Sequence, residues 1–189
     1  MEIYMFDYIR AEKYITYDGA QLSAHFAYKN FNILGNSIVV FKGGCRIPYE
    51  NMVDLEDVIN HDEIYSKEML HFIAEFFDFS LTEMIMLQRI FASLVSERIL
   101  FETGKVLRRD GDDLFLRDRK LSISIATTTG VSSMFHFAMN LDSSDTPVDT
   151  ISLGEIGIEN IWDFTDKLME CLKKEIKGIR GARCKVIPR

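Results

Sequence analysis

One lysine in an alternating polar pattern is the residue whose type and spacing best suit chemistry. Lys120, Ser122 and Ser124 share one face of a predicted strand, because successive side chains of a strand point to opposite faces, and aliphatic residues occupy the other face. An ammonium on a small polar face can bind a carboxylate or stabilise negative charge that develops in a transition state. This face could form the floor of a pocket, with Lys120 as a catalytic candidate and with Asp113, Arg119, Ser122 and Ser124 as candidate ligand contacts. The alternative is a charged hairpin exposed to water.

A pair of glycines indicates where a ligand can approach the backbone. Ser37–Phe41 is an apolar, β-branched run typical of a buried strand, and it leads into Lys42-Gly43-Gly44-Cys45-Arg46. Glycine permits backbone conformations that other residues avoid, so we predict a turn in which Gly43, Gly44 and Arg46 face the ligand. A plain turn is the simpler alternative. A thiol exposed at this turn and activated by its basic neighbours would be a nucleophile.

Other polar side chains are also candidates. His136 lies in an apolar strand, where an inward imidazole needs a hydrogen-bond partner, so it is either a core histidine or a ligand contact. Gln21 follows a turn signal, Asp18-Gly19, and can hydrogen-bond a ligand or a neighbouring loop. His71 and Glu75 have the spacing of one helical face and could join nearby acidic residues around a metal. A hydrogen-bonded histidine at the edge of the core explains His71 more simply, so we expect no metal at the site.

Composition narrows the classes of function. The chain has 189 residues, 47% hydrophobic and 27% charged, which favours a single globular domain over 1–189. A net charge of -7 argues against a nucleic-acid-binding or membrane surface. The first residues lack the pattern of a signal peptide, and no apolar run is long enough to cross a bilayer, so we expect a cytoplasmic protein. Three cysteines without ligand spacing support neither disulfides nor zinc.

The predicted elements are strands and helices without regular alternation. Strands are predicted at 2–9, 37–41, in a hairpin from 112 to 125, at 133–141 and at 184–187. Helices are predicted at 20–28, 66–77, 80–104 and 158–177, where Gly178 ends the last one. This order favours an α+β fold with packed helices on a mixed, mostly antiparallel sheet.

The hairpin resembles the core motif of lipoate- and biotin-protein ligases. The matching text is DDLFLRDRKLSIS followed by FHFAMNL. The resemblance implies a class II synthetase-like fold and ATP with magnesium as cofactors. It also implies that Lys120 contacts the acyl carboxylate and the α-phosphate of ATP, with Asp113 beside it. Those ligases have an Arg-rich loop with three consecutive glycines, whereas this chain has a pair.

Nearly the whole chain also resembles an uncharacterised prokaryotic family, the domain of unknown function DUF366, through YDGAQL, MVDLEDV, MLHFI and DRKLSISIAT. The two resemblances together predict a domain that binds a carboxylate-bearing or adenylate-like small molecule and activates or transfers its acyl group. The alternative is a non-catalytic module for small-molecule binding or dimerisation that kept the fold and lost the chemistry. The acidic surface and the final helix leave room for a homodimer.

Overall fold

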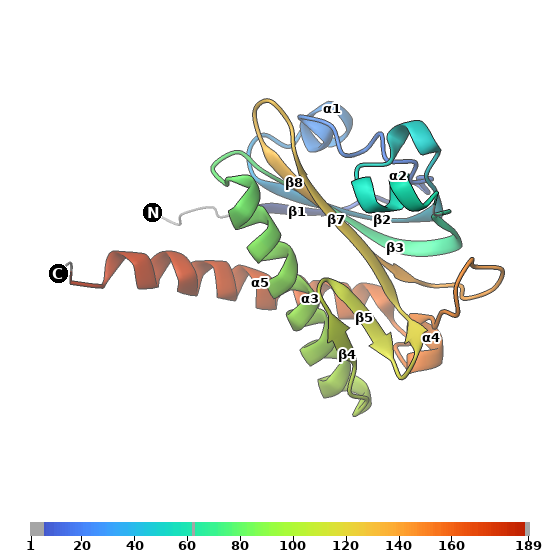
Figure 1. Ribbon diagram of the computed structural model, residues 1–189. Coiled ribbons are helices and arrows are strands. Elements are labelled where there is room, and N and C mark those ends of the chain that lie inside the picture. The colour runs from blue at the N-terminus through green and yellow to red at the C-terminus, as the bar shows by residue number, and fades with distance from the viewer. Residues whose placement is uncertain (1–5, 62, 188–189) are drawn as a thin grey trace.

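A five-stranded sheet forms the centre of the molecule (Figure 1). The structure, a computed structural model, describes residues 6–61 and 63–187. The strand order is β1-β2-β3-β8-β7, with β1 and β2 parallel and the other neighbours antiparallel. A smaller antiparallel sheet has the order β4-β5-β6. The strands are β1 Asp7–Arg10, β2 Ser37–Arg46, β3 Tyr65–Phe76, β4 Arg108–Asp110, β5 Asp113–Leu116, β6 Arg119–Lys120, β7 Ser122–Thr128 and β8 Ser133–Asn140.

Helices cover the larger sheet unequally. They are α1 Phe26–Phe31, α2 Leu55–Asn60, α3 Leu81–Thr103, α4 Leu153–Ile156, α5 Ile161–Cys184 and the 3-10 helix η1 Tyr49–Asn51. The long helices α3 and α5 pack on one face, while α1 and α2 lie on the opposite side (Figure 1). Strand alternation explains the two layers, since Leu70 and Phe72 of β3 join the core under α3 whereas Met69 and Ile73 join the other. The predicted α+β class is therefore confirmed.

The region predicted as a helix at 66–77 is the central strand β3, so that prediction was wrong. Both faces of β3 are covered by packed layers, and from Met69 to Phe76 every residue is buried. Burial on both sides replaces the usual alternation of a strand with a continuous apolar run, which periodicity cannot distinguish from a buried helix.

Other predicted boundaries also need correction. The helix expected at 20–28 begins only at Phe26, after a run of turns. Gly178 does not end the last helix, and α5 continues to Cys184 in place of the strand expected at 184–187. The turn expected at Gly43-Gly44 is absent, because β2 runs through both glycines to Arg46. Of the strand expected at 2–9, residues 7–9 lie in β1 and residues 2–5 lie outside the described residues.

The helix and the hairpin around Lys120 can be compared with their predictions from the sequence. Ser80 and Glu83 form the predicted capping box of α3, and Gly104 ends that helix with a positive φ of 71°. The predicted hairpin is confirmed only in part, because β5 pairs with the two residues of β6. The predicted second strand at 121–125 instead enters the larger sheet as β7 and pairs with β8. No helix within residues 6–61 and 63–187 has the length and apolar character needed to cross a bilayer.

Candidate functional site

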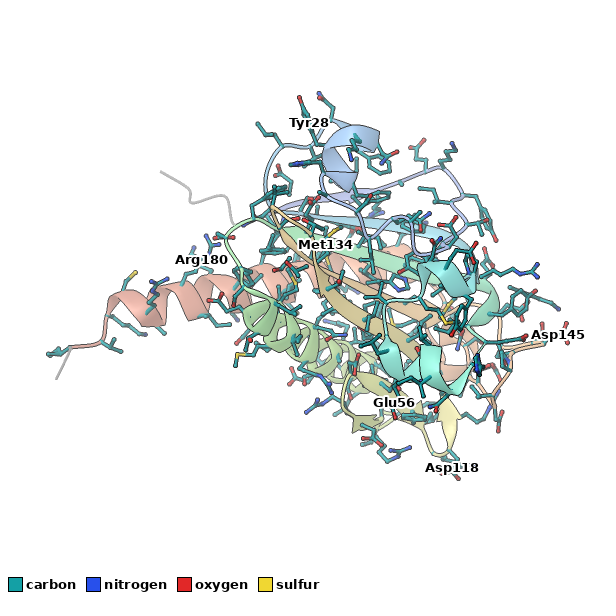
Figure 2. All side chains as sticks on the ribbon, turned by 45° about the horizontal axis from the view of Figure 1, so that its top comes forward. Tyr28, Glu56, Asp118, Met134, Asp145 and Arg180 are labelled. Carbon is teal, nitrogen blue, oxygen red and sulfur yellow. The ribbon has the colours of Figure 1, made fainter. Side chains whose placement is uncertain are left out.

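A cavity of about 640 Å³ lies along β7, the edge strand of the larger sheet. Its walls come from β7 and β8, the first half of α3, the hairpin residues Asp112, Asp113 and Lys120, and two covering segments, residues 47–57 with 63–64 and residues 146–150. Figure 2 shows α2, marked by Glu56, and the loop of Asp145 on the side of the molecule away from the projecting end of α5. A cavity of this size can hold a small organic molecule.

Lys120 lies on the wall of this cavity. Its Nζ is 2.7 Å from Oδ2 of Asp113, and the two side chains are 28% and 30% exposed. The backbone of Lys120 is held by hydrogen bonds with Asp149 and Ile151, so the residue joins β6 to the 142–151 segment. Burial raises the pKa of the Asp113 carboxyl above its usual value, although the Lys120 ammonium acts in the opposite direction. The structure thus brings the predicted lysine and aspartate together in one cavity.

The two predicted serines also line the cavity but have structural partners. Ser122 Oγ accepts a hydrogen bond from the Leu114 N–H at 3.0 Å, which connects β7 to β5. Ser124 Oγ donates to the His136 carbonyl at 2.8 Å. The side-chain amide of Gln88, on α3, lies 2.7 Å from Ser124 Oγ and 2.7 Å from Asp112 Oδ2. These bonds fix the polar wall of the cavity.

His136 lies in the wall and belongs to a buried pair. Its Nε2 is 3.0 Å from Nδ1 of His71, and His71 Nε2 is 3.1 Å from the Gly43 carbonyl oxygen. The ring of Tyr17 stacks on His136 with centroids 3.7 Å apart. Burial lowers the pKa of His71 to about 4, and burial together with His71 lowers the pKa of His136 well below its usual value. Both imidazoles are therefore neutral at physiological pH.

The glycine pair lies away from the cavity. The chain around Ile15 covers Gly43 so closely that an added Cβ would lie 1.7 Å from the Ile15 carbonyl oxygen. The neighbouring Tyr17 N–H donates to the Gly44 carbonyl, and the Arg46 N–H donates to the Tyr17 carbonyl. Gly43, Gly44 and Arg46 are not among the residues that line the cavity. The glycines serve close packing of two backbone segments, and only the Gly43 carbonyl reaches the site, through His71.

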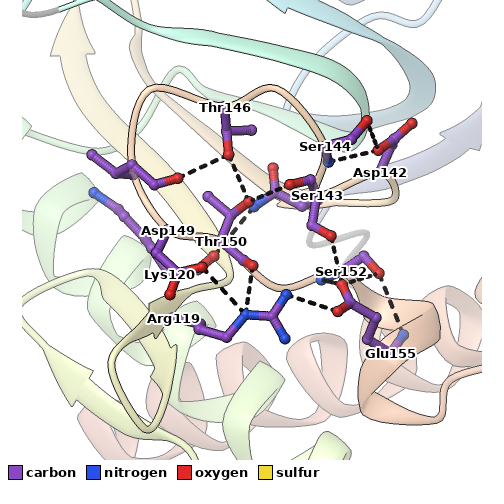
Figure 3. A network of polar contacts seen from close by, with 12 residues as sticks. Arg119, Lys120, Asp142, Ser143, Ser144, Thr146, Asp149, Thr150, Ser152 and Glu155 are labelled. Carbon is purple, nitrogen blue, oxygen red and sulfur yellow. Dashed lines mark hydrogen bonds and ion pairs between the residues drawn. The ribbon is translucent and has the colours of Figure 1, made fainter.

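Arg119 and Gln21 are not among the residues that line the cavity, and each is held by local partners. Arg119 donates from Nε to the Thr150 carbonyl and pairs with Glu155, whose pKa is lowered to about 2 mainly by hydrogen bonds from Ser143 and Arg119. Figure 3 shows this network beneath the 142–151 segment, with the Lys120 side chain extending away from it. Gln21 accepts from the Asp18 N–H and donates to the Thr16 carbonyl. Arg119 therefore anchors the loop that positions Lys120.

The cavity lining carries more carboxylates than cations. Among the described residues, two basic side chains line it, Lys120 and Arg89, and each contacts an aspartate, Asp113 and Asp112 respectively. Three further acidic residues come from the covering segment, Asp54, Asp57 and Glu63. An anionic ligand must therefore bind at one of the two cations rather than in a generally positive field.

Two other sequence hypotheses concerned metal and thiol chemistry. Within the part of the chain that the structure describes, no group of three or more His, Cys, Asp or Glu side chains could hold a metal ion. Glu75 accepts hydrogen bonds from the His25 N–H and the Ser132 hydroxyl, so it contributes to the fold. Cys45 is buried, and burial raises the pKa of its thiol to about 12, which opposes nucleophilic chemistry.

Sequence reasoning missed three contributors to the cavity, Gln88, Asp112 and Tyr17. A signal existed for Gln88, since it interrupts an apolar helical face at the spacing of Met84 and Phe91 and is nevertheless buried, 3% exposed. A polar residue in such a position needs a partner across the packing interface. No comparable local signal marks Tyr17, because its contact with His136 joins distant parts of the chain.

Comparison with known proteins identifies the fold. A solved structure, a protein of unknown function from Pyrococcus horikoshi, is 36% identical, with a TM-score of 0.89 over 97% of this chain and 99% of that one. An uncharacterised protein of Methanocaldococcus jannaschii is 31% identical over 92% of this chain and 81% of its own length. Biotin protein ligase from Aquifex aeolicus, solved with biotin and ATP, is 14% identical, with a TM-score of 0.61 over 90% of this chain and 70% of that one.

The chain therefore has the fold of biotin and lipoate protein ligases, as the hairpin motif predicted. The low identity to these enzymes establishes the fold alone. Sequence similarity over the full length is to the uncharacterised proteins. The family model of the domain of unknown function DUF366 matches residues 6–187, and the chain belongs to that family.

Proposed function

We propose that this protein is a single ligase-like domain that binds a carboxylate-bearing or acyl-adenylate-like small molecule along β7 and activates or transfers its acyl group. The observation that carries the proposal is the position of Lys120, whose ammonium lies on the wall of a ligand-sized cavity beside Asp113. A partly exposed ion pair can exchange one carboxylate for another at small cost. A similar fold in a ligase solved with biotin, a carboxylic acid, supports this class of ligand.

Lys120 would act by stabilising negative charge. When a nucleophile attacks an acyl carbonyl, charge develops on the carbonyl oxygen, and a fixed ammonium near that oxygen lowers the barrier. The backbone bonds of Lys120 to Asp149 and Ile151 hold the residue in place, so little reorganisation is needed. Asp113 would orient the ammonium before the ligand arrives. Its raised pKa indicates a carboxylate that is poorly solvated in its present position.

The residues do not fit ATP in the way that the ligase resemblance implies. Gly43 and Gly44 lie within β2 under the Ile15 segment, so they provide no open loop for phosphates. Arg46 lies outside the cavity lining as well. The proposed chemistry therefore depends on the acyl group and Lys120, and the covered glycines favour acyl transfer over activation with ATP.

Binding and turnover can be tested separately. Titration calorimetry with biotin, lipoate and medium-chain fatty acids should reveal an acid whose affinity falls at least about tenfold in Lys120→Met. Lys67→Met is the matched control, because Lys67 forms a comparable ion pair with Asp145 outside the cavity. Acyl transfer is then measured with the thioester of that acid, and pyrophosphate release with ATP tests activation. Equal affinity in Lys120→Met and Lys67→Met would refute the assignment of Lys120.

A non-catalytic binding or dimerisation module is the second candidate. The covered glycine pair and the excess of carboxylates in the lining favour it, since both differ from an active adenylating site. It predicts saturable binding of the acid without transfer or pyrophosphate release. Sedimentation analysis of the wild-type protein tests the homodimer independently of either activity.

A further inference from the structure

A chain of hydrogen bonds connects a backbone carbonyl to the cavity. It runs from the Gly43 carbonyl oxygen to His71 Nε2 at 3.1 Å, and from His71 Nδ1 to His136 Nε2 at 3.0 Å. A carbonyl oxygen only accepts hydrogen bonds, so His71 Nε2 must carry a proton and donate it. In a neutral His71 the other ring nitrogen, Nδ1, is then an acceptor.

The same argument determines the tautomer of the second imidazole, that of His136. His71 Nδ1 needs a donor, so His136 Nε2 must carry a proton, and neutral His136 is left with an unprotonated Nδ1. A proton on both nitrogens of either ring would place a positive charge in a buried site, among the rings of Tyr17 and Phe41. The lowered pKa values of both histidines agree with this neutral pair.

His136 lines the cavity, and its Nδ1 is not fully enclosed. The residue is 1% exposed overall, and Nδ1 makes no hydrogen bond to any described residue. Among the described residues, Ser37 Oγ is the only side-chain nitrogen or oxygen that is both fully enclosed and without a hydrogen-bond partner. His136 Nδ1 also lacks a partner, so it must retain some accessible surface. A buried acceptor with one open direction requires a donor from a ligand or water.

We propose that His136 Nδ1 is a fixed hydrogen-bond acceptor that selects ligands carrying an N–H or O–H group at this position of the cavity. Gly43 and His71 act as positioning residues, because they set the tautomer. This acceptor extends the proposed function by adding a second recognition element to the cavity. It recognises a hydrogen-bond donor, whereas Lys120 recognises a carboxylate. A lactam, amide, urea or alcohol group satisfies the acceptor, whereas a carboxylate, phosphate or tertiary amide places a second acceptor or an alkyl group against it.

The tautomer can be measured without any ligand or variant. The protein has four histidines, so long-range ¹H–¹⁵N spectra of ¹⁵N-histidine-labelled protein can resolve and assign the ring nitrogens. We expect protonated Nε2 and unprotonated Nδ1 in both His71 and His136 at about pH 7. A protonated Nδ1 in His136 would overturn the proposal. This outcome is independent of turnover, so failure of the acyl assay and failure of the tautomer assignment are distinguishable.

Selection can be tested with a matched pair of probes, 2-pyrrolidinone and N-methyl-2-pyrrolidinone, which differ in one N–H. We expect 2-pyrrolidinone to shift the His136 Nδ1 resonance and to bind about tenfold more tightly than its methylated form. Equal affinities, or a preference for the methylated probe, would contradict the proposal.

Two variants of His71 separate tautomer control from packing. His71→Phe removes both hydrogen bonds, so His136 should become a mixture of tautomers and the difference between the probes should shrink. His71→Gln can donate to the Gly43 carbonyl and accept from His136, so it should restore both the tautomer and the probe preference. If both variants retained the wild-type tautomer and preference, the relay through His71 would be wrong.

Discussion

The two ends of the cavity are built by opposite means. At one end, the Lys120–Asp113 pair joins two flexible side chains that each remain more than a quarter exposed, at 28% and 30%. At the other end, two buried rings are tied to a backbone carbonyl and stacked against Tyr17. The first end can change partners easily, whereas the second cannot move without breaking packed backbone contacts.

This difference assigns different tasks to the two ends. An exposed ion pair contributes little to stability, so its ammonium is available for a ligand. A buried polar chain costs free energy if any member loses its partner, so its geometry is kept. We infer that the rigid end determines which ligand fits and that the Lys120 end performs the charge chemistry. Each end can be broken separately.

The largest effect is expected from Gly43→Ala, which changes the residue whose carbonyl holds His71 at the rigid end. The new Cβ would lie 1.7 Å from the Ile15 carbonyl oxygen, a backbone atom that cannot rotate away. The segment that carries Tyr17 must shift, which should lower the free energy of unfolding by about 3 kcal/mol or more. Urea denaturation followed by circular dichroism measures the change.

Gly178→Ala is the control for this substitution. Gly178 lies within α5, and nothing approaches within 4 Å of an added Cβ. Alanine there should raise the stability by about 0.5–1 kcal/mol, through helix propensity. If Gly43→Ala were as harmless as Gly178→Ala, the close packing at the base of the histidine pair would not hold.

The second effect is a dependence of stability on pH. Burial lowers the folded-state pKa of His71 to about 4, so between that value and the unfolded value near 6.5 the unfolded state binds more protons. The contribution of neutral His71 to the free energy of unfolding is complete above the unfolded-state pKa and is lost as pH falls toward the folded-state pKa. Between pH 7 and 5, His71 alone should account for about 2 kcal/mol of lost stability, and His136 acts in the same direction.

His71→Gln should reduce this loss, because glutamine does not titrate. Glu155 provides a contrast, since its pKa is lowered to about 2 and its stabilising contribution is lost only as pH falls from the usual glutamate pKa toward that value. Denaturation midpoints at several pH values distinguish the two windows. An unchanged pH profile in His71→Gln would mean that the buried pair is not neutral in the folded protein.

The Lys120 end could be predicted from the sequence because its signals are local. The alternation around Ser122 and Ser124, together with the lysine and aspartate of one hairpin, brings the same residues to one cavity in the structure. The helix that carries Gln88 was marked by a capping box and a terminal glycine, both of which depend on neighbouring residues only. Short-range patterns therefore sufficed for this part of the fold.

The sequence identified His136 as a buried imidazole that needs a partner, but it could not predict the arrangement of the rigid end, because that depends on contacts between distant strands. β3 was mistaken for a helix, which placed His71 beside Glu75 on one helical face, whereas in the sheet His71 lies beside Phe41 and Ala138. The role of Gly43 also requires the segment at Ile15 that covers it. Neither burial on both faces nor the crossing of two backbones leaves a periodic signal in one sequence.

The smallest change in stability is expected from Lys120→Met, although its effect on ligand binding should be large. Both partners of the ion pair are partly exposed, so its loss should alter the free energy of unfolding by less than about 1 kcal/mol. Without the Lys120 ammonium, which lowers the pKa of Asp113, the effect of burial is unopposed by that charge and raises this pKa further. Because a raised carboxyl pKa favours the folded state only at low pH, the variant should lose stability as pH rises above the usual aspartate value. Asp113→Asn in the same background should remove this pH dependence. A loss in Lys120→Met as large as that in Gly43→Ala would show that Lys120 is structural, and the division of tasks between the two ends would fail.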